Sequence, residues 1–186
     1  GLGRKIGAGV SETESRVAVP RPRMTVLIPT YRDAHLLQKS LPVFLQNLPE
    51  ELEVIVLNND PSQDVRDCIG ESADDPRVRI IEMGESFFSR AANRGILESS
   101  GELVMFCNAD LFPTQEYLAQ ISAFFERRPR AGAAIGKILR YELAADRATD
   151  VIDTAGLALN RQRRFMPRGE GERDDGRFDE ELEVFG

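Results

Sequence analysis

Polar residues follow several apolar runs of the sequence, at the points where strands of a buried sheet would end. Asp110 closes the triplet Asn108-Ala109-Asp110 after one run, and Asn58 and Asn59 follow another. A carboxylate in such a place suits Mg²⁺ or Mn²⁺, which prefer oxygen ligands and often share them with substrate phosphates. Neighbouring amides and hydroxyls suit a nucleobase, a ribose and a phosphate, although Asn-Asp-Pro is also an ordinary turn sequence. The other candidates of this kind are Pro29, Thr30, Tyr31, Arg90 and Asn93.

Short apolar runs alternate with amphipathic segments along the chain. We predict strands at 24–28, 53–57, 78–81 and 103–107, with a fifth beginning at 133–135. Helical spacing predicts helices over 36–48, which Asp33 would cap and Pro42 would kink, and over 62–69, 88–96 and from Thr114 onward. All-apolar strands between amphipathic helices are typical of a parallel sheet covered on both faces. The fold class predicted is therefore α/β, a three-layer α/β/α sandwich with a mostly parallel sheet and ligands at its carboxyl edge.

Length, charge and composition narrow the class of protein. A chain of 186 residues suits one globular domain, and its net charge of −7 counts against non-specific nucleic-acid binding. No apolar run approaches the roughly 20 residues of a transmembrane helix. A single histidine, His35, excludes a multi-histidine metal site. The two cysteines, Cys68 and Cys107, favour a reducing, cytoplasmic setting without a disulfide, and Cys107 is predicted to be a core residue.

The two ends of the chain differ from its middle. Residues 1–23 are predicted to be a tail or linker, and 24–186 one domain that stops before a further half. The apolar ending 182–186 predicts an exposed patch and self-association. A hairpin is expected at 152–164, and the basic cluster around it favours a solvated turn over a diphosphate or lipid-linked acceptor site. That cluster consists of Arg161, Arg163, Arg164 and Arg168. The acidic run that follows favours a solvated tail, whereas Phe87 and Phe88 are expected to anchor the core.

Four segments, in order and at family spacing, resemble the family 2 glycosyltransferases and their nucleotide-sugar-binding half of GT-A fold. They are Val26-Leu-Ile-Pro-Thr-Tyr31, Glu53-Val-Ile-Val-Leu-Asn-Asn59, Phe88-Ser-Arg-Ala-Ala-Asn-Arg-Gly-Ile96 and Gly101-Glu-Leu-Val-Met-Phe-Cys-Asn-Ala-Asp110. Two later segments, 153–157 and 183–186, are similar to rhamnosyltransferase-like members.

The resemblance implies a role for each matching position. Pro29, Thr30 and Tyr31 would line the nucleobase pocket, and Asn58, beside Asn59, stands where the family usually has a base-contacting Asp. Arg90 and Asn93 would lie near the base and the diphosphate. The triplet Asn108-Ala109-Asp110 occupies the Asp-x-Asp place, with Asp110 as the ligand of Mg²⁺ or Mn²⁺.

The activity that this resemblance implies is inverting, metal-assisted transfer of a sugar from a UDP-, dTDP- or GDP-linked donor to a saccharide or lipid-linked acceptor, as in polysaccharide biosynthesis. The location implied is the cytoplasm, or the inner face of a membrane as a peripheral protein. The family's general base lies in the downstream acceptor half, so no catalytic residue is named and the chain is expected to be inactive alone. The acidic candidates are Asp174, Asp175, Asp179, Glu180 and Glu181.

Two other functions stay open. A sugar nucleotidyltransferase shares the architecture, but it would need a Gly-rich loop where Pro29-Thr30-Tyr31 stands. A non-enzymatic nucleotide-sugar-binding or interaction module is favoured by Asn58 and Asn108, which replace acids. The lack of glycines after the first strand counts against a nicotinamide-type site.

Overall fold

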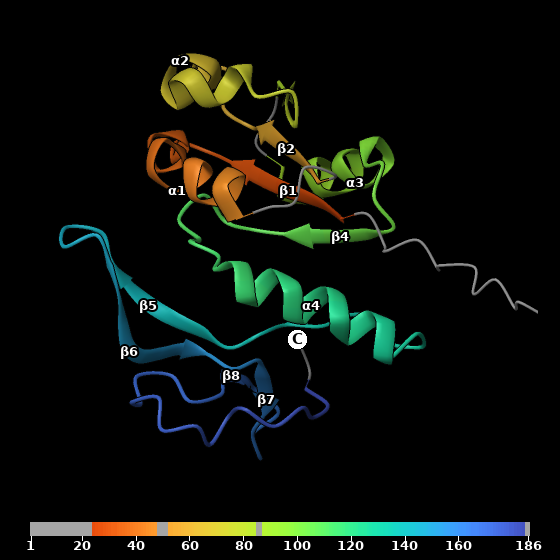
Figure 1. Ribbon diagram of the computed structural model, residues 1–186, viewed down its shortest axis with the longest axis vertical. Coiled ribbons are helices and arrows are strands. Elements are labelled where there is room, and N and C mark those ends of the chain that lie inside the picture. The colour runs from red at the N-terminus through yellow and green to blue at the C-terminus, as the bar shows by residue number, and fades with distance from the viewer. Residues whose placement is uncertain (1–23, 48–51, 85–86, 185–186) are drawn as a thin grey trace, which may run out of the picture.

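The centre of the molecule is a four-stranded parallel sheet, seen in a computed structural model that describes residues 24–47, 52–84 and 87–184 (Figure 1). The tail predicted at 1–23, Leu48 and the last two residues lie outside these ranges. The strands run in the order β3-β2-β1-β4. Their bounds are β1 (Met24–Thr30), β2 (Glu53–Asn58), β3 (Val78–Glu82) and β4 (Leu103–Phe106). The predicted parallel sheet is confirmed.

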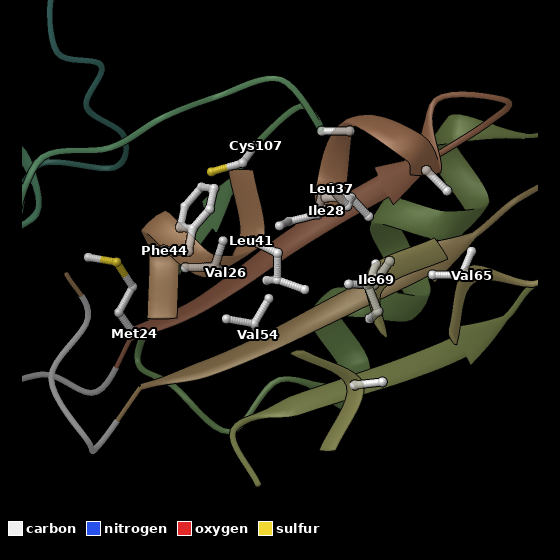
Figure 2. Close-up of a cluster of buried hydrophobic side chains, with 14 of the residues drawn as sticks. Met24, Val26, Ile28, Leu37, Leu41, Phe44, Val54, Val65, Ile69 and Cys107 are labelled. Atoms are coloured by element: carbon white, nitrogen blue, oxygen red, sulfur yellow. The ribbon is translucent and has the colours of Figure 1, made fainter. Parts of the chain in front are cut away.

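Helices cover both faces of this sheet. Buried side chains of α1, α2 and α4 pack on one face, whereas Ala91 of α3 packs against Leu27, Ile55 and Leu57 on the other. Figure 2 shows the first of these clusters, in which Phe44 and Leu41 of α1 lie over β1 and β2. The three layers are therefore as predicted. The helices are α1 (Ala34–Asn47), α2 (Val65–Ile69), α3 (Phe88–Glu98) and α4 (Gln115–Arg127).

The central strands are buried because both of their faces are covered. Leu27 on β1 and Ile55 on β2 face α3, while their neighbours Val26 and Val54 face α1, and all four are fully buried. Burying each such side chain stabilises the fold by about 1.5–3 kcal/mol relative to leaving it exposed. This burial explains why the strands contain almost no polar residue until they end.

Side-chain hydrogen bonds fix the positions at which several helices begin. Asp64 caps α2 by accepting from Asp67 N, and Thr114 caps α4 by accepting from Tyr117 N over 3.0 Å. Asp33 precedes α1, but its carboxylate accepts from Tyr31 N over 2.8 Å, which ties the helix start to the end of β1. The helix continues through Pro42 to Asn47.

The predicted fifth strand and the predicted hairpin are wrong in their bounds. Residues 133–135 form no strand and are exposed, and the next strand begins at Ile138. It pairs antiparallel with its neighbour rather than joining the parallel sheet. A second hairpin follows, so residues 152–164 span parts of two hairpins. The strands are β5 (Ile138–Glu142) with β6 (Arg147–Thr154), and β7 (Leu157–Leu159) with β8 (Phe165–Pro167).

The acidic run after β8 is largely exposed, as its composition predicts, but it is not a free tail. Lys137 Nζ lies 2.7 Å from Asp174 and 2.5 Å from Asp179, and Arg127 lies 2.6 Å from Glu181. The Phe178 ring packs against Gly169. Long-range ion pairs therefore hold this run against α4 and the segment before β5. None of the helices described is long and apolar enough to cross a membrane.

Candidate functional site

The carboxyl ends of β1, β2 and β4 bring three of the predicted segments to one edge of the sheet. Thr30 and Asn58 are register partners, and Asn59 N donates to Thr30 O over 2.9 Å. Cys107 N donates to Leu27 O over 2.9 Å, which places the residues after β4 beside the end of β1. Parallel strands end at the same edge, so the segments 29–31, 58–60 and 108–110 are neighbours there.

The side chain of Asn58 is used within the protein. Its Nδ2 donates to Glu82 Oε2 over 2.7 Å and to Gln63 O over 3.0 Å, and its Oδ1 accepts from Asp60 N over 3.0 Å. An Asp at this position would lose both donations and would face the Glu82 carboxylate. The geometry thus explains why an amide stands here and shows that Asn58 shapes the loop after β2.

Asp60 is a buried carboxylate at the same edge that was not among the predicted site residues. It accepts from Ser62 Oγ over 2.6 Å and from Ser62 N over 2.9 Å. These bonds, with the Arg32 guanidinium 3.8 Å away, hold the pKa of Asp60 below its ordinary value. The sequence signal was the third position of Asn58-Asn59-Asp60, which an ordinary turn also explains.

Buried polar atoms without partners gather at these strand ends. Among the described residues they are Thr30 Oγ1, Asn59 Oδ1 and Gln63 Oε1. Buried polar groups in folded proteins nearly always have a hydrogen-bond partner, and exceptions require a physical reason such as a bound ligand or water. The three atoms belong to the ends of β1 and β2 and to the loop that follows β2, so the unmet hydrogen-bonding capacity lies at the predicted site.

Residue Ala109 is buried, whereas Asn108 and Asp110 on either side of it are exposed. The turn is held from below by Ser40 of α1, whose Oγ donates to Ala109 O over 2.5 Å. Ser40 was not predicted, because a small polar residue on a helix carries no signal of a contact 69 residues away. Burial raises the pKa of the adjacent Cys107 thiol to about 12, so it stays neutral and is the core residue predicted.

Among the described residues, this edge offers a divalent metal one carboxylate without a partner rather than a complete set of protein ligands. Within residues 24–47, 52–84 and 87–184, no three His, Cys, Asp or Glu side chains form a group that could hold a metal ion. The exposed Asp110 carboxylate makes no hydrogen bond or ion pair with any of these residues. Mg²⁺ is commonly held by one or two carboxylates together with substrate phosphates and waters, so the residues present fit a metal that arrives with a diphosphate.

The start of α3 presents aromatic and basic side chains to solvent. Phe87 and Phe88, expected to anchor the core, are 56% and 64% exposed. The Arg90 guanidinium lies over the Phe87 ring at 5.0 Å, and Asn93 is exposed one turn further along. The expectation failed because Phe87 precedes α3 and the inward-facing position of the first turn is taken by Ala91.

Four of the five acidic candidates for a general base are engaged elsewhere, and one of them, Asp179, shares Lys137 with Asp174. Asp174 bonds Lys137, Asp175 bonds Arg177 and Glu181 bonds Arg127, and each of these bonds lowers the pKa of the carboxyl. A lowered pKa makes a carboxylate a weaker base. These carboxylates therefore hold the acidic run in place, and we assign none of them as the general base.

The fold defines an α/β protein in which polar residues gather at the ends of the parallel strands. The chain matches the family model described as glycosyl transferase family 2 over residues 25–178. It is 29% identical over 99 residues to the glycosyltransferase GlyA of Streptococcus pneumoniae serotype 4, covering 52% of this chain and 14% of that protein. It is 28% identical over 88 residues to an uncharacterized glycosyltransferase of Rickettsia bellii, covering 47% and 13%. The chain thus spans about a seventh of each of these relatives.

Solved structures show the same fold. The mannosyltransferase PcManGT of Pyrobaculum calidifontis, in complex with GDP-Man and Mn²⁺, superposes with a TM-score of 0.51 at 24% identity, covering 69% of this chain and 38% of that one. S. aureus TarS 1–349 in complex with UDP-GlcNAc gives 0.51 at 17% identity, covering 64% and 38%. The chain belongs to glycosyl transferase family 2 and has the GT-A fold. The rhamnosyltransferase-like subtype is not confirmed.

Proposed function

We propose that the chain binds the nucleoside diphosphate of a sugar nucleotide at the carboxyl edge of the sheet. The observation that carries this proposal is the set of unpartnered buried atoms there, Thr30 Oγ1 and Asn59 Oδ1 above all. Hydrogen-bonding groups of a base or ribose would satisfy these atoms, with small shifts of the loops to admit the ligand. Two GT-A proteins of the same fold bind GDP-Man with Mn²⁺ and UDP-GlcNAc, which supports this ligand class.

Asp110 is the residue proposed to hold Mg²⁺ or Mn²⁺ together with the diphosphate. Its carboxylate is exposed beside the buried Ala109. When bound, such a metal neutralises negative charge on the diphosphate. Arg90 and Asn93 at the start of α3 would add a positive charge and a hydrogen-bond donor to the same ligand.

The reaction proposed for the whole protein is sugar transfer with inversion. An acceptor hydroxyl oxygen forms a bond to the anomeric carbon as the bond from that carbon to the diphosphate breaks. The diphosphate leaves with the bonding electron pair, and the acceptor proton passes to a general base. We assign no residue of this chain as that base, and the acceptor is a saccharide or lipid-linked hydroxyl.

Thermal unfolding in the presence of nucleotides tests this proposal. UDP, dTDP and GDP are each added, with and without Mn²⁺, to the wild type and to Asp110→Ala. The control is Asp67→Ala, which removes an exposed carboxylate elsewhere, on α2. A ligand at about 100 times its dissociation constant stabilises the fold by about 2.7 kcal/mol. A metal-dependent shift with one nucleotide, lost in Asp110→Ala and kept in Asp67→Ala, is expected. No shift with any nucleotide overturns the proposal.

A binding module without transferase activity is the second candidate. It is favoured by Asn58, which stands where the family usually has a base-contacting Asp and whose side chain bonds Glu82, Gln63 O and Asp60 N within the protein. Transfer to an acceptor, or release of free sugar from a bound sugar nucleotide, measured with the whole protein rather than with this chain alone, separates the two candidates. The module predicts binding with no release above the rate without protein.

A further inference from the structure

The hairpin of β7 and β8 carries positive charge that the chain as a whole lacks. The chain has a net charge of −7, yet residues 157–168 contain four arginines and no acidic residue. Three of them, Arg161, Arg163 and Arg164, lie in the turn between the two strands, and we name them the arginine turn. All three are exposed. Figure 1 shows this hairpin at the end of the molecule far from α2.

The arginine turn differs from its neighbours in its lack of carboxylate partners. The other arginines between β5 and Phe178, apart from Arg168, each pair with at least one Asp or Glu. These pairs are Arg140 with Asp153 and Glu170, Arg147 with Glu142, Arg173 with Asp150, and Arg177 with Glu172 and Asp175. Within the part of the chain that the structure describes, no guanidinium of the arginine turn makes an ion pair. In an acidic protein, this leaves three positive charges directed at solvent.

The backbone of the turn holds these charges in place. Asn160 Oδ1 accepts from Gln162 N over 3.0 Å and from Arg164 N over 2.9 Å, and Asn160 O accepts from Arg163 N over 2.9 Å. The two strands continue the pairing on either side. The arginines are thus presented from a fixed turn, and less backbone ordering remains to be done when they meet an anionic partner.

Large apolar side chains flank the arginine turn on both strands. Leu159 and Phe165 are directly opposite each other, so they share one face, and they are 42% and 59% exposed. Met166, 48% exposed, lies on the other face. Exposed apolar groups beside arginines are typical of segments that bind the boundary between lipid headgroups and acyl chains. Binding of a soluble polyanion would require only the positive charges and not the apolar side chains.

We propose that this hairpin docks the protein on a membrane surface that contains anionic lipids. The arginine turn would meet the lipid phosphates, and Leu159 and Phe165, which share one face of the hairpin, would enter the apolar boundary beneath them. Each arginine near such a surface contributes about 1 kcal/mol, so the three together strengthen binding about 150-fold. The proposal does not depend on nucleotide binding at the sheet edge.

Vesicle flotation with the 186-residue chain tests the charge. The chain is mixed with phosphatidylcholine vesicles that contain or lack phosphatidylglycerol. We expect binding only to the anionic vesicles, and a loss of about 150-fold when Arg161, Arg163 and Arg164 are all changed to Gln. The control changes Arg66, Arg94 and Arg130 to Gln, which removes the same charge from other exposed places. Equal loss in both triple variants, or no binding by the wild type, overturns the proposal.

A fluorescent reporter tests the apolar contact. The chain contains no tryptophan, so Phe165→Trp introduces a single one at the tip of the hairpin. Membrane entry predicts a blue shift of its emission with anionic vesicles and none with heparin, a soluble polyanion. If the shift is absent with vesicles, the hairpin does not enter the membrane and the proposal is overturned. If the shift is equal with heparin, the partner is a soluble polyanion rather than a membrane. Far-ultraviolet circular dichroism of each variant confirms that it is folded.

Discussion

Replacing Ser40 with alanine removes the buried hydrogen bond that supports the turn at Asn108-Ala109-Asp110. Ser40 is fully buried, and its Oγ lies 2.5 Å from Ala109 O. Without this donor the carbonyl is left unpaired beneath the turn, and an unsatisfied buried group costs about 1–3 kcal/mol. We therefore expect S40A to lower the free energy of unfolding by about 2 kcal/mol.

Ser99→Ala is the matched control, because Ser99 Oγ also donates to a backbone carbonyl, Ile96 O, over 2.8 Å. That bond is exposed at the end of α3, so water replaces the lost donor and the expected change is within about 0.5 kcal/mol. Urea unfolding measures both variants. The midpoint should fall for S40A with an unchanged slope, since a changed slope would indicate a different denatured state.

The same variant should also weaken the site. Ser40 fixes the backbone next to Asp110, so S40A is expected to reduce Mn²⁺-dependent nucleotide binding while leaving metal-free binding close to that of the wild type. If S40A proves as stable as S99A, the hydrogen bond does not support the turn and the reasoning is refuted.

Three other predictions concern the core and the sheet. Burial alone would raise the pKa of Glu53, but hydrogen bonds from Arg79, Ser100 and Thr25 outweigh it and lower the pKa below 4.5. The stabilisation from these hydrogen bonds of Glu53 is therefore present above pH 4.5 and is lost as the pH falls through the lowered pKa. Acid should consequently destabilise the wild type more than Glu53→Gln. Parallel pH–stability curves of the two proteins would contradict this. Thiol labelling followed by mass spectrometry should modify Cys68 and spare Cys107, whose pKa is about 12, until the chain unfolds. Gly95→Val should cost about 1–3 kcal/mol in thermal unfolding, because a Cβ there lies 2.8 Å from Leu27 Cδ1, whereas Gly132→Val meets nothing within 4 Å and should not.

The parallel sheet was predictable because its strands are buried on both faces. Runs such as 53–57 are almost wholly apolar, and nothing but a covered strand or a core helix explains them. The antiparallel strands were misplaced for the converse reason. β5 alternates Leu139 and Tyr141 with the exposed Arg140, a weaker signal than the continuous apolar run at 133–135 that precedes it.

The place of the candidate residues at the sheet edge was predictable from the sequence, but their side-chain contacts were not. Polar residues after apolar strands indicated the sheet edge correctly, since parallel strands end together. Neither the pairing of Asn58 with Glu82 nor the contact of Ser40 with Ala109 follows from local sequence, because each joins segments that only the folded sheet brings together. Phe87 was misassigned because an apolar residue at a helix start can face either the core or solvent.

We propose that the ends of β1, β2 and β4 form one nucleotide site. Amide chemical shifts of the isotopically labelled chain, recorded while UDP or GDP is titrated with Mg²⁺, test it most directly. We predict that the largest shifts fall on Thr30, Asn59 and Asp110 together, and that the arginine turn stays unchanged. Shifts confined to the arginine turn, or spread evenly over the surface, would contradict it.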